Sequence, residues 1–229
     1  MENTGKAVVA EFVGTFALIF FGAGSVILAL NGQLDLVGVA LAHGLVIAIM
    51  VSQMGHLSGG VFNPAIQIAL WVTGKMSTSR TVAYIVAQVL GGAAGALLLK
   101  FLLPGHEFQA ALGGAATLNP AISAGKGILL EAVGTFFLVW AVFATAIDDR
   151  GPFGKTAGFT IGLTITFGIL AIGPWTGAAF NVARWLGPAL ASGHWDDWFV
   201  WIVGPVAGAI LAGVSYWGLF LRDKELATP

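Results

Sequence analysis

The chain has 229 residues, of which 57% are hydrophobic and only 9% are charged, with a formal net charge of -1 and a mean hydropathy of +0.89. A soluble domain of this length is far less apolar, so the composition indicates a polytopic membrane protein. The net charge leaves no basic patch to neutralise phosphates, which argues against nucleic acid as a partner. The sequence contains no cysteine, which excludes disulfides, thiolate metal sites and nucleophilic thiols.

Six apolar segments are long enough to cross about 30 Å of hydrocarbon as helices. They are the residue ranges 7–30, 36–54, 81–103, 127–147, 157–173 and 198–221. The first is too long for the apolar region of a signal peptide and contains Glu11, so we expect a retained span. Residues 104–126 form a polar, glycine-rich connector, which divides a single transmembrane domain of residues 1–229 into the repeats 7–103 and 127–221.

The stretch from His56 to Ala65 interrupts the apolar sequence after the second span. Asn63 is a favoured helix N-cap, and Pro64 takes the first helical position, where its missing N–H costs nothing. The pattern therefore predicts a short helix over residues 63–72. Irregular backbone at membrane depth is tolerated only where it faces protein or lines a water-filled cavity. This stretch therefore predicts a pore.

A second interruption contains Asn181, Val182 and Ala183, and its Asn lies 118 residues after Asn63 (181 minus 63). It predicts a second short helix over residues 181–190. The segment 10–16 also recurs as 130–136, an offset of 120 that agrees with the first. Three spans separate the copies, so the second repeat is inverted in the membrane. Broken helices at matching places in inverted repeats indicate the permeation site.

With both interruptions in view, the sequence resembles the aquaporin, or major intrinsic protein, family, whose signature is two Asn-Pro-Ala half-helices that meet at mid-membrane. The resemblance runs from about Ala7 to about Phe220. One departure is Val182, which stands where the family usually has proline. A third tripeptide, Asn119-Pro120-Ala121, lies in the connector and fits neither offset, so we interpret it as a turn.

The resemblance implies an all-α membrane fold with six transmembrane helices and two re-entrant half-helices around one pore per chain. It also implies a homotetramer with no cofactor and no metal. Two half-helix N-termini would bring two positive dipole ends, each roughly half an elementary charge, to one point. The Asn63 and Asn181 amides would donate to a passing water and interrupt its hydrogen-bonded chain, so that protons and ions are excluded.

Arg184 lies within an apolar segment, where a charge is expensive and indicates a function. The resemblance places this residue in a selectivity filter at the outer mouth. Counted by the family's spacing from the two Asn residues, the other filter positions are His43, Ile169 and Ala178. This set is similar to that of the plant tonoplast branch and differs from that of strict water channels. For His43, a core histidine bonded to a backbone carbonyl is an alternative.

Glu11 and Glu131 are acids within spans and need partners. Their symmetric positions indicate that each accepts hydrogen bonds from the adjacent half-helix loop, whereas a proton relay would need further titratable groups in the same spans. His56 is a candidate for the cytoplasmic mouth, with a loop-stabilising histidine as the alternative. We expect four tryptophans to anchor the sixth span at the membrane interface: Trp195, Trp198, Trp201 and Trp217.

The basic residues predict the orientation, because cytoplasmic loops carry an excess of Lys and Arg. An N-terminus in the cytoplasm places seven basic residues inside: Lys6, Lys75, Arg80, Arg150, Lys155, Arg222 and Lys224. Lys100 and Lys126 then face outward. We expect a multi-pass protein of the plasma membrane with both termini in the cytoplasm.

The expected function is passive conduction of water and of small neutral solutes such as ammonia, urea or glycerol. One alternative is a glycerol facilitator, but that branch usually carries Asp after the filter Arg, where this chain has Trp185. Another is a secondary transporter, which would need a coupling-ion site, and the spans offer only two acids. An enzyme is least expected, because the sequence has no nucleophile with an adjacent base, phosphate loop or metal cluster.

Overall fold

The computed structural model describes residues 4–150 and 156–223, and these residues form helices without a β-strand. Six helices within these ranges are long and apolar enough to cross a membrane. They are α1 (Thr4–Leu30), α2 (Leu36–Ser58), α4 (Thr78–Leu102), α6 (Ala124–Val142), α7 (Ala157–Thr176) and α9 (Val200–Tyr216). Short π-helical segments prolong two of them, η2 (Phe143–Ile147) after α6 and η4 (Trp217–Leu221) after α9. The all-α fold expected from the sequence is confirmed.

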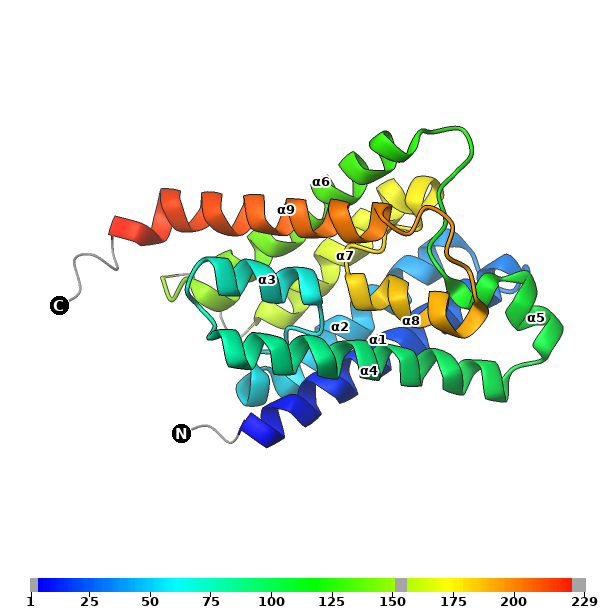
Figure 1. Ribbon diagram of the computed structural model, residues 1–229, viewed down its shortest axis with the longest axis horizontal. Coiled ribbons are helices and arrows are strands. Elements are labelled where there is room, and N and C mark those ends of the chain that lie inside the picture. The colour runs from blue at the N-terminus through cyan, green and yellow to red at the C-terminus, as the bar shows by residue number, and fades with distance from the viewer. Residues whose placement is uncertain (1–3, 151–155, 224–229) are drawn as a thin grey trace.

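Two short helices, α3 (Pro64–Val72) and α8 (Val182–Ser192), lie inside the bundle. Figure 1 shows them end to end along the long axis of the molecule, with α4 and α9 on either side. Each begins after an Asn N-cap in an extended conformation, Asn63 for α3 and Asn181 for α8. Their N-terminal ends therefore meet near the middle of the bundle.

The helices that precede the half-helices run further than the sequence predicts. Helix α2 continues past residue 54 to Ser58, and α7 continues past residue 173, through Pro174, to Thr176. Each ends on a glycine in the left-handed region, Gly59 at φ 94° and Gly177 at φ 75°. A left-handed glycine is the usual stop for a helix. In each helix, this additional turn places a hydroxyl side chain at the site described below.

The connector is more ordered than a polar, glycine-rich linker. It contains the short helix α5 (Gly105–Ala110) and the turn η1 (Leu112–Gly114). Phe108 and Ala111 are buried and join the main hydrophobic cluster. The connector therefore folds back over the end of the bundle, and Figure 1 shows α5 at the end opposite the first and last described residues.

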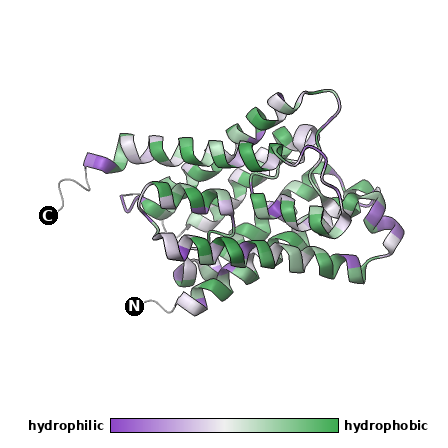
Figure 2. Cartoon of the chain, viewed as in Figure 1, coloured by the Kyte–Doolittle hydropathy of each residue, from purple (hydrophilic) through white to green (hydrophobic). Residues whose placement is uncertain are grey.

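Glycines allow the long helices to approach closely. Gly91 of α4 lies against the backbone of Phe12 in α1, and Gly208 of α9 lies against that of Ala132 in α6. The two contacts are equivalent in the two repeats. Lipid provides no hydrophobic driving force for helix association, so close packing at small residues stabilises these helix contacts instead. Figure 2 shows apolar residues along most of the helices, with hydrophilic residues gathered toward the two ends of the bundle.

Basic residues are distributed unequally between these ends. The end that carries Thr4 and Asp223 also carries five of the residues expected in the cytoplasm: Lys6, Lys75, Arg80, Arg150 and Arg222. Lys100 and Lys126 lie at the opposite end, where α4 finishes and α6 begins. Two further residues of the expected cytoplasmic set, Lys155 and Lys224, lie outside the described residues.

Hydrogen bonds from an ion pair link the segment after η2 to α9 and η4, at the end that carries Thr4 and Asp223. The Arg150 guanidinium donates to both carboxylate oxygens of Asp148, at 2.8 and 2.6 Å, and to the Phe220 carbonyl at 2.8 Å. The Tyr216 hydroxyl donates to the same carboxylate at 3.2 Å. The hydrogen bonds from Arg150 hold the pKa of Asp148 below its ordinary value. This contact fixes η2, which borders the cavity described below.

Close packing of α2 on α7 generates a prediction about stability. A Cβ at Gly162 of α7 would overlap the Gly44 carbonyl oxygen and lie 2.8 Å from the Ala48 Cβ. We expect Gly162→Ala to lower the free energy of unfolding by about 1–3 kcal/mol, as overpacking does. Gly125→Ala in α6 is the control, because a Cβ there meets no atom within 4 Å. It should stabilise the helix by about 0.5–1 kcal/mol. Thermal unfolding in detergent would measure both, and equal shifts would contradict this packing.

Candidate functional site

Glu11 in α1 is fully buried and accepts four hydrogen bonds. Its Oε1 accepts from the Ser58 hydroxyl at 2.6 Å and the Val61 N–H at 3.0 Å. Its Oε2 accepts from the Phe62 N–H and the Gln88 amide, each at 2.7 Å. Two of the four donors are backbone groups of the loop before α3. The carboxylate therefore satisfies N–H groups that no helix pairs at this depth.

Glu131 in α6 has the same arrangement with the loop before α8. Its Oε1 accepts from the Thr176 hydroxyl at 2.6 Å and the Ala179 N–H at 3.0 Å. Its Oε2 accepts from the Phe180 N–H at 2.8 Å. This side chain is also fully buried. The two acids are thus bound to the loops and lie apart from one another in different repeats, which does not suit an acid and base pair.

Ser58 and Thr176 are the hydroxyl residues at the ends of α2 and α7. Each hydroxyl also accepts a backbone N–H two residues on, from Gly60 and Ala178 respectively, at 3.1 Å. The sequence analysis missed both residues. A signal was present, because in each repeat a hydroxyl residue followed by glycine stands five positions before the Asn (63 minus 58 and 181 minus 176).

The carbonyls of these two hydroxyl residues accept from aromatic side chains. The Tyr84 hydroxyl donates to Ser58 at 3.1 Å, and the Trp201 indole N–H donates to Thr176 at 2.9 Å. Trp201 is fully buried, so the expectation that it anchors the sixth span at the membrane interface is wrong. A buried indole needs a hydrogen-bond acceptor, and the end of α7 provides one. Trp195 and Trp198 are exposed.

The two Asn residues bind each other's loops. Oδ1 of Asn63 accepts from the Ala65 N–H, and Oδ1 of Asn181 from the Ala183 N–H, each at 2.9 Å. The Asn63 amide donates to the Phe180 carbonyl, and the Asn181 amide donates to the Phe62 carbonyl, each at 2.8 Å. Each amide has two N–H groups, and this reciprocal bond uses one of them. The second can serve a molecule beside it.

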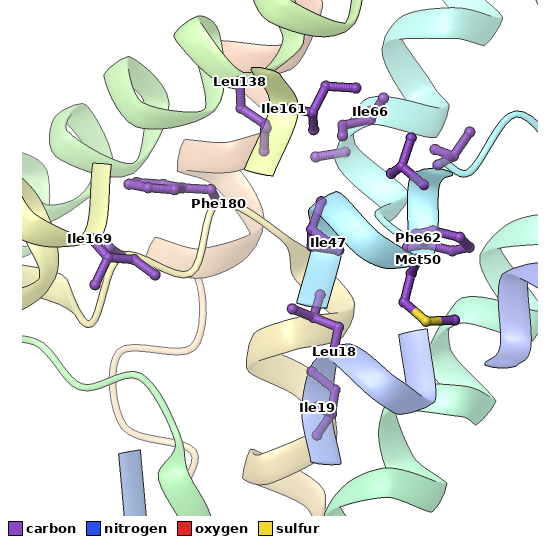
Figure 3. Packing of buried hydrophobic residues seen from close by; sticks show 14 of the residues in the cluster. Leu18, Ile19, Ile47, Met50, Phe62, Ile66, Leu138, Ile161, Ile169 and Phe180 are labelled. Carbon is purple, nitrogen blue, oxygen red and sulfur yellow. The ribbon is translucent and has the colours of Figure 1, made fainter. Parts of the chain in front are cut away.

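Both Asn side chains border a cavity of about 130 Å³, here called the inner cavity. It extends from His43, Ala178 and Arg184 past the two Asn residues to Lys75 and Met76, between the end of α3 and the start of α4. Its other walls are mainly apolar, and Figure 3 shows several of them projecting from different helices: Leu18, Ile47, Ile66, Leu138 and Ile161. The arrangement is a narrow apolar passage with a few polar groups at fixed points.

The four candidate filter residues border two cavities. His43, Ala178 and Arg184 border the inner cavity, whereas Ile169 borders an outer cavity of about 450 Å³. Arg184 borders both, so its side chain lies at the boundary between them. His43 Nδ1 pairs with the Val39 carbonyl at 2.9 Å, and its Nε2 has no partner among the described residues. The imidazole is therefore anchored on one side, and its Nε2 is buried beside Gly22 of α1.

Gly114 of the connector turn approaches Arg184, which the sequence analysis did not foresee. The Arg184 guanidinium donates to the Gly114 carbonyl at 3.3 Å. Gly114 has φ 76° and lies directly against the backbone of Ala23, where a Cβ would clash. The consecutive glycines 113 and 114 were the available signal, but the sequence could not indicate that this part of the connector lies close to Arg184 in the second repeat.

The third tripeptide forms a turn beside the outer cavity. Its Asn119 amide donates to the Pro174 carbonyl at 3.0 Å, and its backbone N–H donates to the Trp175 carbonyl at 2.8 Å. No membrane half-helix starts there. Val182 lies half-buried in the first turn of α8, and Pro64 is buried at the start of α3.

His56 is exposed and borders a third cavity of about 460 Å³, between the end of α2 and the segment that follows α6. Asp148 and Asp149 border the same cavity. His56 is not among the residues that border the inner cavity. In the described ranges 4–150 and 156–223, no three His, Cys, Asp or Glu side chains converge as metal ligands.

Comparisons with known proteins agree on one family. The model of the major intrinsic protein family matches residues 2–216. Aquaporin TIP4-4 of Zea mays is 42% identical over 231 residues, which cover 95% of this chain and 88% of the relative. Aquaporin-4 of Mus musculus is 38% identical over 225 residues, which cover 96% and 69%. The X-ray structure of the aquaglyceroporin from Plasmodium falciparum matches with a TM-score of 0.84 at 25% identity, covering 98% of this chain and 100% of that one.

The contacts of Glu11 generate a second prediction. Glu11→Leu would leave four buried donors without an acceptor, and each such loss costs about 1–3 kcal/mol. We expect this variant to yield little folded protein. Glu11→Gln keeps one acceptor oxygen, but its NH2 group would face donors that now bind the second oxygen. We therefore expect its stability to lie between that of the unmodified protein and that of Glu11→Leu. Thr15→Val, which removes only a bond to the Glu11 carbonyl within α1, is the control. Size-exclusion profiles and unfolding midpoints would measure the series, and a Glu11→Leu variant as stable as the control would contradict this role.

Proposed function

The chain belongs to the major intrinsic protein family of membrane channels, and we propose that it conducts water passively while excluding protons and ions. Proteins of this family are channels and not enzymes, and no catalytic activity is indicated. The observation that carries the proposal is the pair of Asn amides beside the inner cavity. Each keeps one N–H for a solute after it has bonded the opposite loop.

Water passing between Asn63 and Asn181 accepts both of these donors on its oxygen. Its hydrogens then point away along the passage, so the chain of hydrogen bonds that a proton would follow is interrupted at this point. The N-termini of α3 and α8 add two positive dipole ends in the same region. Half-helix dipoles of this kind exclude protons and cations from a pore. Most side chains that line the inner cavity are apolar and cannot replace the hydration shell of an ion.

Arg184 is the second barrier to cations. It lies at the boundary of the inner and outer cavities, its guanidinium donates to the Gly114 carbonyl, and its side chain is buried. We propose that His43, Ala178, Arg184 and, from the outer side, Ile169 form the selectivity filter. Ile169 and Ala178 offer little polarity, so small neutral solutes such as ammonia and urea are expected to pass with water.

A glycerol facilitator is the second candidate, and it is favoured by the structural match to an aquaglyceroporin. The residue after the filter Arg argues against it. Trp185 is buried and stacks on Trp201, with ring centroids 5.9 Å apart, where a glycerol facilitator usually carries Asp. This residue therefore offers no carboxylate to a polyol. We propose water as the main solute and glycerol as a minor one.

We propose a homotetramer in the plasma membrane with both termini in the cytoplasm. The excess of basic residues at the end that carries Thr4 and Asp223 supports this orientation. Large apolar side chains on the outer faces of the long helices, such as Phe21, Leu90 and Phe167, suit contact with lipid or with neighbouring copies.

The channel proposal predicts fast water flux without proton flux. Purified protein in liposomes should equilibrate water rapidly in stopped-flow light scattering, while an enclosed pH-sensitive dye reports no added proton leak. Flux should stay proportional to the gradient and independent of ions. Asn181→Ala, which removes a donor, should lower water flux or admit protons. Saturable or ion-coupled flux would indicate a transporter, and a proton current through the unmodified channel would refute the exclusion mechanism.

The filter proposal predicts a change in solute preference. His43→Phe combined with Ile169→His narrows the boundary region and adds polarity on its outer side. Ammonia and urea flux should therefore fall more than water flux, in the same stopped-flow assay. Leu45→Phe is the control, because Leu45 is 48% exposed on the outer face of α2. An equal loss for every solute, or no loss for any, would show that these two side chains do not select.

A further inference from the structure

Phe62 and Phe180, the residues directly before the two Asn residues, have an unusual backbone. Their φ angles are 47° and 50°, in the left-handed region that residues with side chains rarely adopt. Their carbonyl oxygens accept the bonds from the opposite Asn amides. The direction of these two carbonyls therefore decides where both amides, and their remaining N–H groups, point.

The aromatic rings of these residues occupy notches formed by glycines. The Phe62 ring lies on Gly14 of α1, and the Phe180 ring lies on Gly134 of α6 and Gly168 of α7. A Cβ at Gly14 or Gly134 would overlap the ring. Both rings are buried, with relative exposures of 0% and 2%, and Figure 3 shows them among the buried hydrophobic residues. Neither ring can move aside without displacing its neighbours.

Each glycine notch lies three residues after an acid of the same helix, Gly14 after Glu11 and Gly134 after Glu131. Residues three apart share one face of a helix. On that face the carboxylate accepts the Phe N–H, at 2.7 Å in the first repeat and 2.8 Å in the second. The glycine receives the ring of the same Phe. One helix thus holds each Phe at two points, its N–H and its side chain.

We propose that Gly14 and Gly134 are positioning residues for the pore donors. By seating the Phe rings they hold the left-handed backbone, and this aims each Phe carbonyl at the opposite Asn amide. Gly14 thereby positions Asn181 through Phe62, and Gly134 positions Asn63 through Phe180. This inference rests on the proposed water channel and adds a determinant of its proton exclusion. A glycine that served only helix packing would alter the amount of folded channel and leave its selectivity unchanged.

The test is a series of variants measured for water permeability and for the ratio of proton flux to water flux. Gly14→Ala pushes on the Phe62 ring, and it should lower water permeability about tenfold or more, since small misplacements of aligned groups have effects of this size. It should also raise the proton-to-water ratio. Gly24→Ala in the same helix is the matched control, because the nearest atom to its Cβ would be Leu99 Cδ2 at an ordinary 3.4 Å. The control should match the unmodified channel.

A compensating change separates positioning from packing. Phe62→Leu removes about the volume that the alanine methyl adds, and volume-conserving changes are tolerated best. Gly14→Ala with Phe62→Leu should therefore restore the proton-to-water ratio toward that of the unmodified channel. Phe62→Leu alone leaves the notch partly empty and should raise the ratio. Gly134→Ala, alone and with Phe180→Leu, repeats the test in the second repeat.

Two results would overturn the inference: a Gly14→Ala channel with an unchanged proton-to-water ratio, or a double variant whose ratio is no better than that of Gly14→Ala. If Gly14→Ala does not fold, Phe62→Leu alone decides, and an unchanged ratio in that variant refutes the positioning role. Failure of the proposed function would look different, because the unmodified protein itself would then show no water flux.

Discussion

Backbone N–H groups at the middle of a membrane must be paired, and the structure depends on how this chain pairs them. The loops before α3 and α8 leave the helical ladder, so their N–H groups need other acceptors. Glu11 and Glu131 provide them, each from a long helix that packs beside the loop. Because a carboxylate has several lone pairs, one side chain holds two backbone groups and a hydroxyl at once. The half-helices can therefore begin at mid-membrane.

The inverted repeat makes the centre symmetric and leaves the two ends different. At the centre, each Asn caps its own half-helix and binds the opposite loop, so the two loops are joined by a reciprocal pair of hydrogen bonds. Three residues beyond the Asn the two repeats differ in charge, because the first half-helix carries Ile66 and the second carries Arg184. Both residues border the inner cavity. Of these two matching positions, only the one in α8 carries a cation, and the Gly114 carbonyl of the connector accepts a hydrogen bond from it.

The proposed activity follows from separating two tasks along one passage. In the proposed mechanism, the paired Asn residues and the dipoles of α3 and α8 exclude charged species, and a neutral solute is left free to pass. In the same proposal, His43, Ala178 and Arg184 select by size and polarity, and Arg184 also repels cations. The first task is built into both repeats and depends on their shared backbone geometry. The second uses side chains that differ between the repeats, so solute preference can vary while the fold and the charge barrier stay the same.

The sequence by itself determined the six spans, the two half-helices, the inverted repeat and the family, because long apolar runs, Asn-capped breaks and a 118-residue offset are local patterns. It also identified Glu11, Glu131, Asn63, Asn181 and Arg184, since polar groups in apolar segments stand out. Only the tertiary structure decided which loop N–H groups bind the two acids, and that the buried Trp201 donates to the end of α7. It also decided that the Gly114 carbonyl accepts from Arg184, and that the rings of Phe62 and Phe180 pack against glycines. These contacts join residues far apart in sequence, and apolar residues or glycines within apolar helices carry no pattern that reveals their partners.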